Sequence, residues 1–395
     1  MTKLEQLIKE LCPNGVEYKK LSDIATVARG VRVVRDQLAE TGDIPVYQNS
    51  IKPLGYHDKS NVKAYSAFVI GAGAAGEIGF SDVDFWAADD CYYFLCPDNL
   101  NNRYLYFVLM KNQPLILSRV RKASIPRLSR TVIENLVIPV PPLEVQAEIV
   151  KILDNFTELT AELTAELTAR KKQYEYYRDL LLDFGVHGGG ASECEWRTLG
   201  EMFPFIRNGF VGTVTPFYTD KENGVRYLQG TNIHNGVISD NEVFYITKEF
   251  HEKHKKNELQ SDDILMVQSG HVGECAVVGE KYKGSNCHAL IILSNGGQCD
   301  SNYVRYYLQS THGKRILVRI TTGGTVKHIL ASKMKNVVIP FPPIEEQKHI
   351  VSTLDRFDKL CNDISEGLPA EIEARRKQYE YYRDRLLSFE ERKNA

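Results

Sequence analysis

Two clusters of basic side chains carry the clearest chemical signal in this 395-residue chain. One occupies residues 118–130 and the other residues 314–329, and neither contains an acidic residue. Lysine and arginine side chains neutralise phosphate groups and dominate the affinity of proteins for nucleic acids. A solvated surface would explain either cluster alone, but two such clusters favour phosphate binding. The candidate contacts are Arg119, Arg121, Lys122, Arg127 and Arg130 in the first cluster and Lys314, Arg315, Arg319, Lys327 and His328 in the second.

Two short polar stretches could read base edges beside these phosphate contacts. The first, "VYQNS", ends at Ser50, and the second, "YLQGT", ends at Thr231. Glutamine and asparagine amides form paired hydrogen bonds with base edges in the major groove, and hydroxyl groups add single bonds. The candidate base-reading residues are Gln48, Asn49 and Ser50, matched by Gln229, Thr231 and Asn232.

The glycines of "GAGAAG" (Gly71, Gly73 and Gly76) suggest a competing chemistry, because they fit the fingerprint of dinucleotide-binding turns. The matching stretch later in the chain has Gln268 in place of the first glycine. After Gly76 the chain reads as a strand, whereas a phosphate cradle requires a helix. We therefore predict a glycine-rich hairpin, and a nucleotide-binding enzyme built around Gly71–Gly76 is the alternative. No catalytic set recurs in both halves, so the sequence predicts no catalytic, cofactor or metal site on this chain.

The chain is a tandem duplication. Residues 169–184 and 374–389 agree at 13 of 16 positions, and "GAAGE" from Gly73 answers "GHVGE" from Gly270. The separation between matched segments grows steadily along the chain, from 178 to 205 residues, as expected for two homologous modules with different loop insertions. A repeat of this length predicts two domains rather than a solenoid.

Each copy ends in a helical segment that carries a repeated tyrosine stripe. No breaker interrupts the first segment, so residues 144–184 are predicted to form one helix. Gly367 and Pro369 predict a kink or break in the second, because proline removes a helical hydrogen bond. The stripe is Tyr174, Tyr177 and Leu181 in the first copy and Tyr379, Tyr382 and Leu386 in the second, and it is expected to form the contact between two antiparallel helices. Tyr176 and Tyr381 lie off this contact. They are either solvated or form a docking surface that is used twice. The predicted helix and partner interface comprises Gln146, Tyr174, Tyr176, Tyr177, Leu181, Gln347, Tyr379, Tyr381, Tyr382 and Leu386.

Composition narrows the remaining classes of protein. The net charge is −2, and no apolar run approaches 18 residues, so a membrane span is not expected. The N-terminal "MTKLEQLIKELCPNG" lacks the apolar core of a signal peptide. The eight cysteines include no C-x-x-C pair, which favours reduced thiols and a cytoplasmic location.

The stretches "IPVPPLEVQAEIVKILD" and "IPFPPIEEQKHIVSTLD", the twin "KQYEYYRD" segments and the "TAEL" repeats together resemble the specificity subunit of type I restriction–modification enzymes. The resemblance covers essentially the whole chain, although the variable parts match only in plan. It implies an α+β fold in which two homologous mixed α/β target-recognition domains are separated by two long antiparallel, coiled-coil-like helices with pseudo-two-fold symmetry. The expected segments are a first recognition domain at 1–140, a spacer helix at 141–190, a second recognition domain at 191–341 and a second helix at 342–395.

The resemblance also implies a function and partners. The chain would read a bipartite, asymmetric double-stranded DNA target and would position two methyltransferase subunits and the restriction and translocase subunits on it. S-adenosylmethionine, ATP and Mg²⁺ would belong to those partners, and this chain would be non-catalytic, with no cofactor of its own. A helical adaptor whose globular domains bind proteins rather than DNA is the other alternative.

Overall fold

The chain folds into two compact units in a computed structural model. Unit 1 comprises Met1–Thr164 and Ile372–Ala395, and unit 2 comprises Ala165–Glu371. The predicted boundary at residue 190 lies outside the described residues, and the expected division into four segments remains a prediction. The structure describes residues 2–185, 194–324, 327–363 and 366–392.

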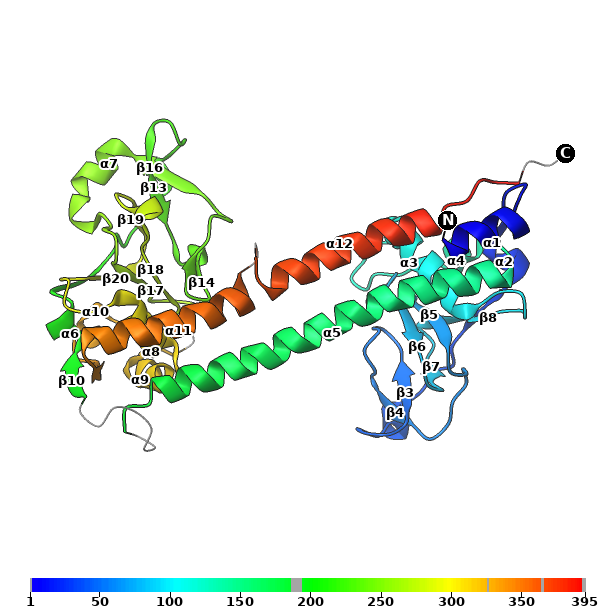
Figure 1. The fold of residues 1–395 in the computed structure, drawn as a ribbon, viewed down its shortest axis with the longest axis horizontal. Helices are drawn as coiled ribbons and strands as arrows, with labels where there is room; N and C mark the ends of the chain where they lie inside the picture. The colour runs from blue at the N-terminus through cyan, green and yellow to red at the C-terminus, as the bar shows by residue number, and fades with distance from the viewer. Residues whose placement is uncertain (1, 186–193, 325–326, 364–365, 393–395) are drawn as a thin grey trace. The chain divides into compact units, whose positions relative to one another are not determined.

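Unit 1 is built around a four-stranded antiparallel sheet with the strand order β2-β8-β5-β6. Figure 1 labels β5, β6 and β8 of this sheet. A three-stranded sheet has the order β4-β3-β7, and β1 pairs with β9. The strands are β1 (Tyr18–Lys20), β2 (Thr26–Arg29), β3 (Ile44–Tyr47), β4 (Gly55–His57), β5 (Ser66–Ile70), β6 (Ile78–Ser81), β7 (Trp86–Ala87), β8 (Cys91–Leu95) and β9 (Val137–Pro139). The helices are α1 (Lys3–Leu11), α2 (Leu21–Ile24), α3 (Asn102–Ser118) and α4 (Arg130–Glu134).

Unit 2 repeats this topology with additional strands, including a two-stranded sheet of β14 and β15. Its large sheet has the order β11-β20-β17-β18, a second sheet has the order β12-β16-β13-β19, and β10 pairs with β21. The strands are β10 (Glu195–Thr198), β11 (Phe205–Asn208), β12 (Tyr218–Thr219), β13 (Gly224–Leu228), β14 (Ile233–His234), β15 (Val237–Ile238), β16 (Phe244–Thr247), β17 (Ile264–Val267), β18 (Cys275–Val277), β19 (Asn286–Cys287), β20 (Leu290–Ser294) and β21 (Val338–Phe341). The helices are α6 (Leu199–Met202), α7 (Lys248–Lys253), α8 (Ser301–Gln309), α9 (Thr311–Ile320), α10 (Ala331–Met334) and α11 (Ile344–Asn362).

The matching topology confirms the predicted duplication, and buried tyrosines show that the two units also share their internal hydrogen bonds. The Tyr104 hydroxyl donates to the Pro139 carbonyl at 3.1 Å, and Tyr303 forms the equivalent bond to Pro340 at 3.0 Å. Both tyrosine side chains are fully buried. Because a buried hydroxyl without a partner is costly, each bond fixes the strand that enters the helical segment to the first turn of α3 or α8.

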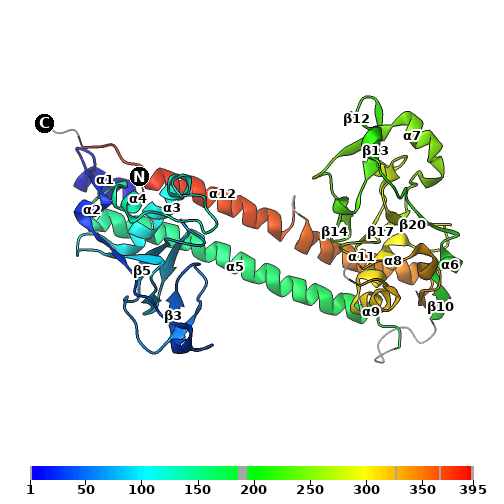
Figure 2. The ribbon, with the colours of Figure 1, turned by 180° about the vertical axis from the view of Figure 1, so that it is seen from behind.

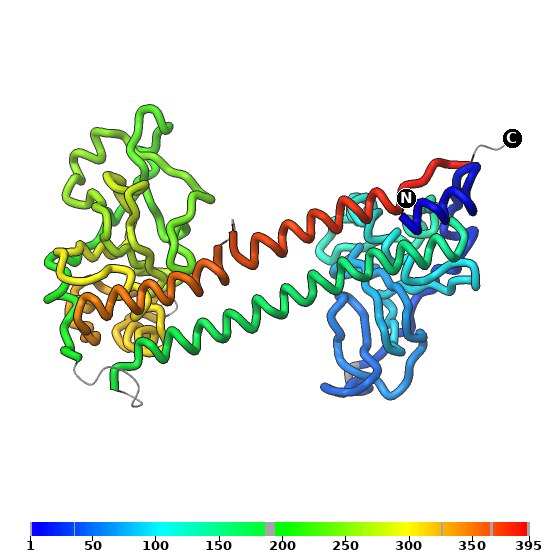
Figure 3. The backbone as a smooth tube through the Cα atoms, viewed as in Figure 1, coloured from blue at the N-terminus to red at the C-terminus, as the bar shows by residue number. Residues whose placement is uncertain are grey.

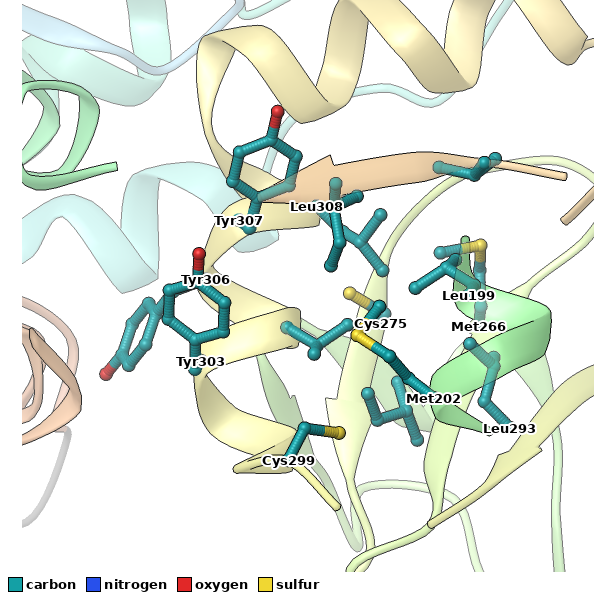
Figure 4. Packing of buried hydrophobic residues seen from close by; sticks show 14 of the residues in the cluster. Leu199, Met202, Met266, Cys275, Leu293, Cys299, Tyr303, Tyr306, Tyr307 and Leu308 are labelled. Carbon is teal, nitrogen blue, oxygen red and sulfur yellow. The ribbon is translucent and has the colours of Figure 1, made fainter. Parts of the chain in front are cut away.

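The core of unit 2 lies between helix α8 and the large sheet (Figure 4). Tyr306 and Leu308 of α8 face Met266 and Leu293 of the sheet, and Met202 of α6 belongs to the same cluster. Helix α11 packs against α8, as seen from behind in Figure 2. This packing buries Ile350, Val351 and Leu354 of α11 in the core of unit 2.

Helix α5 (Leu143–Leu181) is continuous for 39 residues, which confirms the predicted long helix. Its residues as far as Thr164 belong to unit 1, and those from Ala165 onward belong to unit 2. The second copy is divided into α11 and α12 (Leu368–Leu386), so the predicted break near Gly367 is also confirmed.

The C-terminal segment returns to the N-terminal part of unit 1 (Figure 3). The Val16 amide donates to the Glu390 carbonyl at 2.8 Å, and the Arg392 amide donates to the Val16 carbonyl at 2.9 Å. The Tyr18 hydroxyl donates to the Phe389 carbonyl at 3.0 Å. Residues from the two ends of the sequence therefore complete one domain.

Candidate nucleic-acid interface

The glycine hairpin between β5 and β6 brings two predicted DNA-contacting segments of unit 1 together. The Ala74 amide donates to the Asn49 carbonyl at 2.9 Å. The Gly73 amide donates to the Pro126 carbonyl at 3.1 Å. The polar stretch at residues 48–50 and the first basic cluster, which are far apart in sequence, therefore meet at this hairpin.

Close backbone packing requires glycine in this hairpin. Gly73 has a φ of +84°, and a Cβ atom there would lie 2.9 Å from the Asn49 carbonyl oxygen. The chain continues from the hairpin into β6, so residues 71–81 contain no helix N-terminus that could face a phosphate. The structure thus supports the predicted hairpin over the nucleotide-binding alternative, which needs a strand-to-helix turn.

The first basic cluster folds into a tight antiparallel turn. The Arg121 amide donates to the Arg127 carbonyl at 2.8 Å, and the reverse bond measures 3.2 Å. Arg130 forms an ion pair with Glu134 at 2.9 Å. The other four cations are exposed, and within the described part of the chain none has a carboxylate within 4 Å. These four available cations are Arg119, Arg121, Lys122 and Arg127.

Unit 2 has the same construction at the hairpin between β17 and β18. Gly270 and Gly273 have φ angles of +80° and +93°, close to those of the corresponding glycines in unit 1. His328 forms antiparallel bridges with Ser269 and Thr322, as Arg127 does with its own two partners in unit 1. The Ser269 hydroxyl and Nδ1 of His328 lie 2.6 Å apart. Arg127 and His328 therefore occupy equivalent positions.

The predicted base-reading residues of the two units differ in how far their side chains are engaged. Ser50 accepts a hydrogen bond from the Lys52 amide, and Asn49 is exposed. Gln48, also in unit 1, is half-buried. In unit 2, Gln229 donates to the Tyr218 hydroxyl at 2.8 Å, and Thr231 donates to the Glu242 carboxylate at 2.9 Å.

Asn232 corrects the prediction, because it is fully buried. Its side-chain oxygen accepts from the Gln229 amide at 2.9 Å. Its nitrogen donates to the carbonyls of Ser239 and Glu242 at 3.1 and 2.7 Å. The side chain thus holds its own loop together and has no remaining donor or acceptor directed at solvent.

A cavity of about 710 Å³ opens beside the hairpin of unit 2. It is lined by the hairpin, by α9 and by parts of α5 and α11. Lys314 and Lys327 line it, whereas Arg315 and Arg319 are exposed on α9 outside the lining. The charged lining residues are Lys171, Glu175, Arg178, Glu274, Lys314, Lys327 and Asp358.

The second half of α5 is anchored to the N-terminus of α9. Asp179 accepts hydrogen bonds from the amide of Thr311, at 3.1 Å, and from its hydroxyl. Burial would raise the pKa of Asp179, but the hydrogen bonds from Thr311 and the charge of Arg178 lower it below its usual value. Arg178 also lies over the Tyr174 ring at 5.6 Å. These contacts hold α5 against the helix that carries Lys314.

The two glutamines in the predicted partner interface are buried instead. The Gln146 side chain donates to the Pro141 carbonyl and accepts from the Asn101 amide, both at 2.8 Å. Gln347 forms the equivalent donor and acceptor bonds in unit 2 at 2.8 and 2.9 Å. Both side chains are fully buried, so they fasten the helices to their own domains and do not face a partner.

Each unit contains an aromatic triad on its helices. An exposed outer tyrosine meets a middle tyrosine edge-on, with ring centroids 5.4 or 5.5 Å apart. The middle tyrosine stacks on a phenylalanine of another helical segment at 5.3 or 5.7 Å. The outer tyrosines are 59% and 65% exposed. The triads are Tyr381, Tyr382 and Phe156 in unit 1 and Tyr176, Tyr177 and Phe357 in unit 2.

The phenylalanines in these triads were not among the predicted residues. Their signal was available, because Phe156 and Phe357 occupy matching positions in the duplicated segment. The other stripe residues face the domain cores: Tyr174 and Leu181 pack in the core of unit 2, and Tyr379 and Leu386 pack against that of unit 1. The tyrosine stripes therefore pack against the cores of their own domains as well as against another helix.

The described residues contain no group of three or more histidine, cysteine, aspartate or glutamate side chains that could hold a metal ion. All eight cysteines are free thiols. Within the described ranges, none of the helices has the length and apolar character needed to cross a bilayer.

The sequence matches the family model described as "Type I restriction modification DNA specificity domain" over residues 13–170 and again over 191–374. A putative type I restriction enzyme specificity subunit from Haemophilus influenzae is 32% identical over 98% of both chains. The EcoR124I/EcoR124II specificity subunit from Escherichia coli is 38% identical over 64% of this chain and 61% of its own.

The fold also matches solved structures. The S subunit of a type I restriction–modification system from M. genitalium aligns with a TM-score of 0.62 at 15% identity, covering 94% of this chain and 96% of its own. A chain from a study of complex assembly and conformational transition in the type I system has the same TM-score at 17% identity, covering 95% of this chain and 98% of its own.

Proposed function

The chain belongs to the type I restriction–modification DNA specificity family, and from this premise we propose that it reads a bipartite DNA target, one half-site with each unit. It supplies sequence reading rather than catalysis. We call the glycine hairpin, basic segment and polar residues of each unit its reader. Because the two readers carry different side chains on the same scaffold, the two half-sites differ in sequence and the target is asymmetric.

The duplicated reader is the observation that carries this proposal. In each unit a glycine hairpin at the edge of the large sheet is bonded to a basic segment, and exposed cations lie on that segment. Exposed lysines and arginines without carboxylate partners suit phosphate contacts, which position a protein on a duplex. Base edges are then read by the polar side chains beside the hairpin, of which Asn49 is the most accessible in unit 1.

The continuous helix α5 supports a role in setting the gap between the half-sites. A helix rises 1.5 Å per residue, so its length is fixed once its sequence is fixed. Thr157, Thr160 and Thr164 each donate to the carbonyl four residues earlier, so the "TAEL" repeats complete their hydrogen bonds within the helix itself. A segment that needs no domain for its polar groups can change in length without disturbing either reader.

The paired aromatic triads support docking of two copies of one partner, the methyltransferase subunit. Tyr176 and Tyr381 present the same exposed ring in the same edge-on arrangement, one in each unit. Tyrosine is enriched in protein interfaces because its ring buries a large area and its hydroxyl keeps a polar contact. In this assignment S-adenosylmethionine, ATP and Mg²⁺ bind to the methyltransferase and restriction subunits, and the complex works in the cytoplasm.

Salt-dependent binding to a DNA duplex tests this function against a protein-binding adaptor. The full chain, together with its methyltransferase subunits, is expected to lose affinity for a duplex linearly in log–log coordinates as salt rises. Sequencing modified adenines in a strain with and without the gene then identifies the target as two short motifs around an unread gap. A chain that captures its partner subunits but binds no duplex at any salt concentration would be an adaptor.

A further inference from the structure

Three histidines gather around the glycine hairpin of unit 2. His271 lies at the tip of the hairpin and lines the cavity beside it. The ring of His234, on β14, lies edge-on to His271 with centroids 6.4 Å apart. His328 is bonded through Nδ1 to the hydroxyl of Ser269, which lies in the hairpin next to Gly270. His328, His271 and His234 are all exposed.

The equivalent hairpin of unit 1 carries a different set of residues. The position of His328 is taken by Arg127, which forms the same two backbone bridges. The position of His271 is taken by Ala74, the second residue of the matching "GAAGE" stretch. Arginine stays charged at every physiological pH, whereas histidine is the residue whose charge changes between about pH 5 and 8.

We propose that His271 and His328 contact the DNA half-site read by unit 2 and take up protons on binding, so that recognition of this half-site, unlike that of unit 1, depends on pH. This inference rests on the proposed function. A protonated imidazole beside a phosphate or a base acceptor donates a charge-assisted hydrogen bond. The bond from Nδ1 of His328 to Ser269 orients the ring, and its Nε2 atom remains available to the DNA.

The charged side chains near His271 determine how much a bound proton changes the net charge of the cavity. His271 lines the cavity, whose other charged residues are four cations and three carboxylates, so a proton on His271 adds to a small positive net charge; His328 lies outside this lining. Glu274 is partly engaged, since it accepts a hydrogen bond from the Asn235 amide at 3.2 Å. The cations are Lys171 and Arg178 from α5, Lys314 from α9 and Lys327 from the basic segment; the carboxylates are Glu175 from α5, Glu274 from the hairpin and Asp358 from α11.

Two other histidines of unit 2 are unsuited to this role. Burial lowers the pKa of His288, and burial together with the charges of Lys253 and Lys256 lowers that of His254. Both are therefore protonated less readily than an ordinary histidine side chain.

The sign of the effect follows from the charge of DNA. Binding that takes up a proton weakens as the pH rises, by at most tenfold per pH unit for each proton. The full chain with its methyltransferase subunits is titrated from pH 6 to pH 8 with a duplex carrying the motif obtained by methylation mapping. The affinity of the wild type is expected to fall at least fivefold across this range.

Variants locate the effect. The double variant H271Q/H328R, which places arginine where unit 1 has Arg127, is expected to flatten the pH profile and to bind more tightly than the wild type at pH 8. H349Q changes an exposed histidine of α11 that does not line the cavity, and its profile should match that of the wild type. An unchanged slope in the double variant would overturn the proposal.

A pair of altered duplexes separates this inference from the function on which it rests. With the half-site of unit 2 scrambled, the residual binding through unit 1 should lose its pH dependence; with the half-site of unit 1 scrambled, it should keep it. Equal slopes with both duplexes would contradict the proposal while leaving DNA recognition intact. Failure of the wild type to bind any duplex at any pH would instead refute the proposed function.

Discussion

The readers of units 1 and 2 share a backbone but not a surface. Both large sheets have the same strand order, and both glycine hairpins keep the same left-handed φ angles. Yet Arg127 of unit 1 stands where unit 2 has His328, and the exposed Asn49 has no equivalent polar reader in unit 2. Buried bonds such as those of Tyr104 and Tyr303 fix the scaffold, so side chains at the hairpin can differ without cost to the fold.

The helix that leads into the basic segment differs as well. In unit 1, α3 runs unbroken from Asn102 to Ser118, whereas in unit 2 its counterpart divides into α8 and α9. Ser310 causes the division, because its hydroxyl caps α9 by accepting from the Gly313 amide at 3.1 Å. The change of direction places Lys314 on the first turn of a new helix, at the cavity of unit 2. The basic residues of unit 2 therefore lie partly on a capped helix, whereas those of unit 1 follow α3 in a turn.

If the readers act independently, changing the spacer should change the gap and nothing else. Deleting Thr164–Leu167 shortens α5 by about 6 Å and leaves Leu163 in the place of Leu167. We expect methylation of the original target to fall more than a hundredfold, while a target with the same half-sites and a shorter gap becomes methylated. Methylation mapping measures both, and E162A, which keeps the length, serves as the control. Altered half-site letters would show that the readers and the spacer are coupled.

Substituting the buried glutamines compares how much each one stabilises its own unit. Replacing Gln146 or Gln347 with leucine leaves buried backbone groups without partners, and we expect each variant to lose about 2–4 kcal/mol of stability. The loss should be larger at Gln146, which makes an additional bond to the Asn99 carbonyl at 3.0 Å.

Each unit contains one of the two tryptophans of the chain, Trp86 in unit 1 and Trp196 in unit 2. Urea titrations followed by fluorescence in W196F and W86F backgrounds therefore report the units separately. E144Q, on the exposed face of the same helical turn as Gln146, should leave the midpoint unchanged. A destabilisation in the unit that does not contain the substituted glutamine would show that the two units unfold together.

The basic surfaces should contribute to DNA affinity one cation at a time. R127A removes an exposed cation with no carboxylate partner within the described residues, so affinity should fall about tenfold and the salt slope by about one. R130A is the matched control, because Arg130 is already paired with Glu134, and its affinity should stay within twofold. Filter binding over a salt series measures both, and a pull-down with the methyltransferase subunit should show no loss for either variant.

Sequence patterns predicted the elements whose formation depends on local or repeated features. The run without a breaker predicted α5, Gly367 and Pro369 predicted the break after α11, and the mismatch at Gln268 identified the hairpin. What the sequence could not supply was the burial of polar side chains. Gln146 looks like a surface residue because one of its partners, the Asn101 amide, is 45 residues away in sequence. Asn232 looks like one because its partners depend on the fold of its own loop, which the sequence does not define.

The outer tyrosines of the aromatic triads provide the smallest and most selective test of the two-fold plan. Tyr176 and Tyr381 are largely exposed, so replacing either one with alanine should change the stability of the chain by less than about 0.5 kcal/mol. If each triad docks one methyltransferase subunit, Y176A and Y381A should each bind one copy instead of two, and the double variant should bind none. Sedimentation or mass photometry of the assembled complex counts the copies, and Y65A, another exposed tyrosine outside the triads, is the control. Two copies on the double variant would place the docking surface elsewhere on the helices, whereas loss of both copies in one single variant would mean that the partner subunits bind cooperatively.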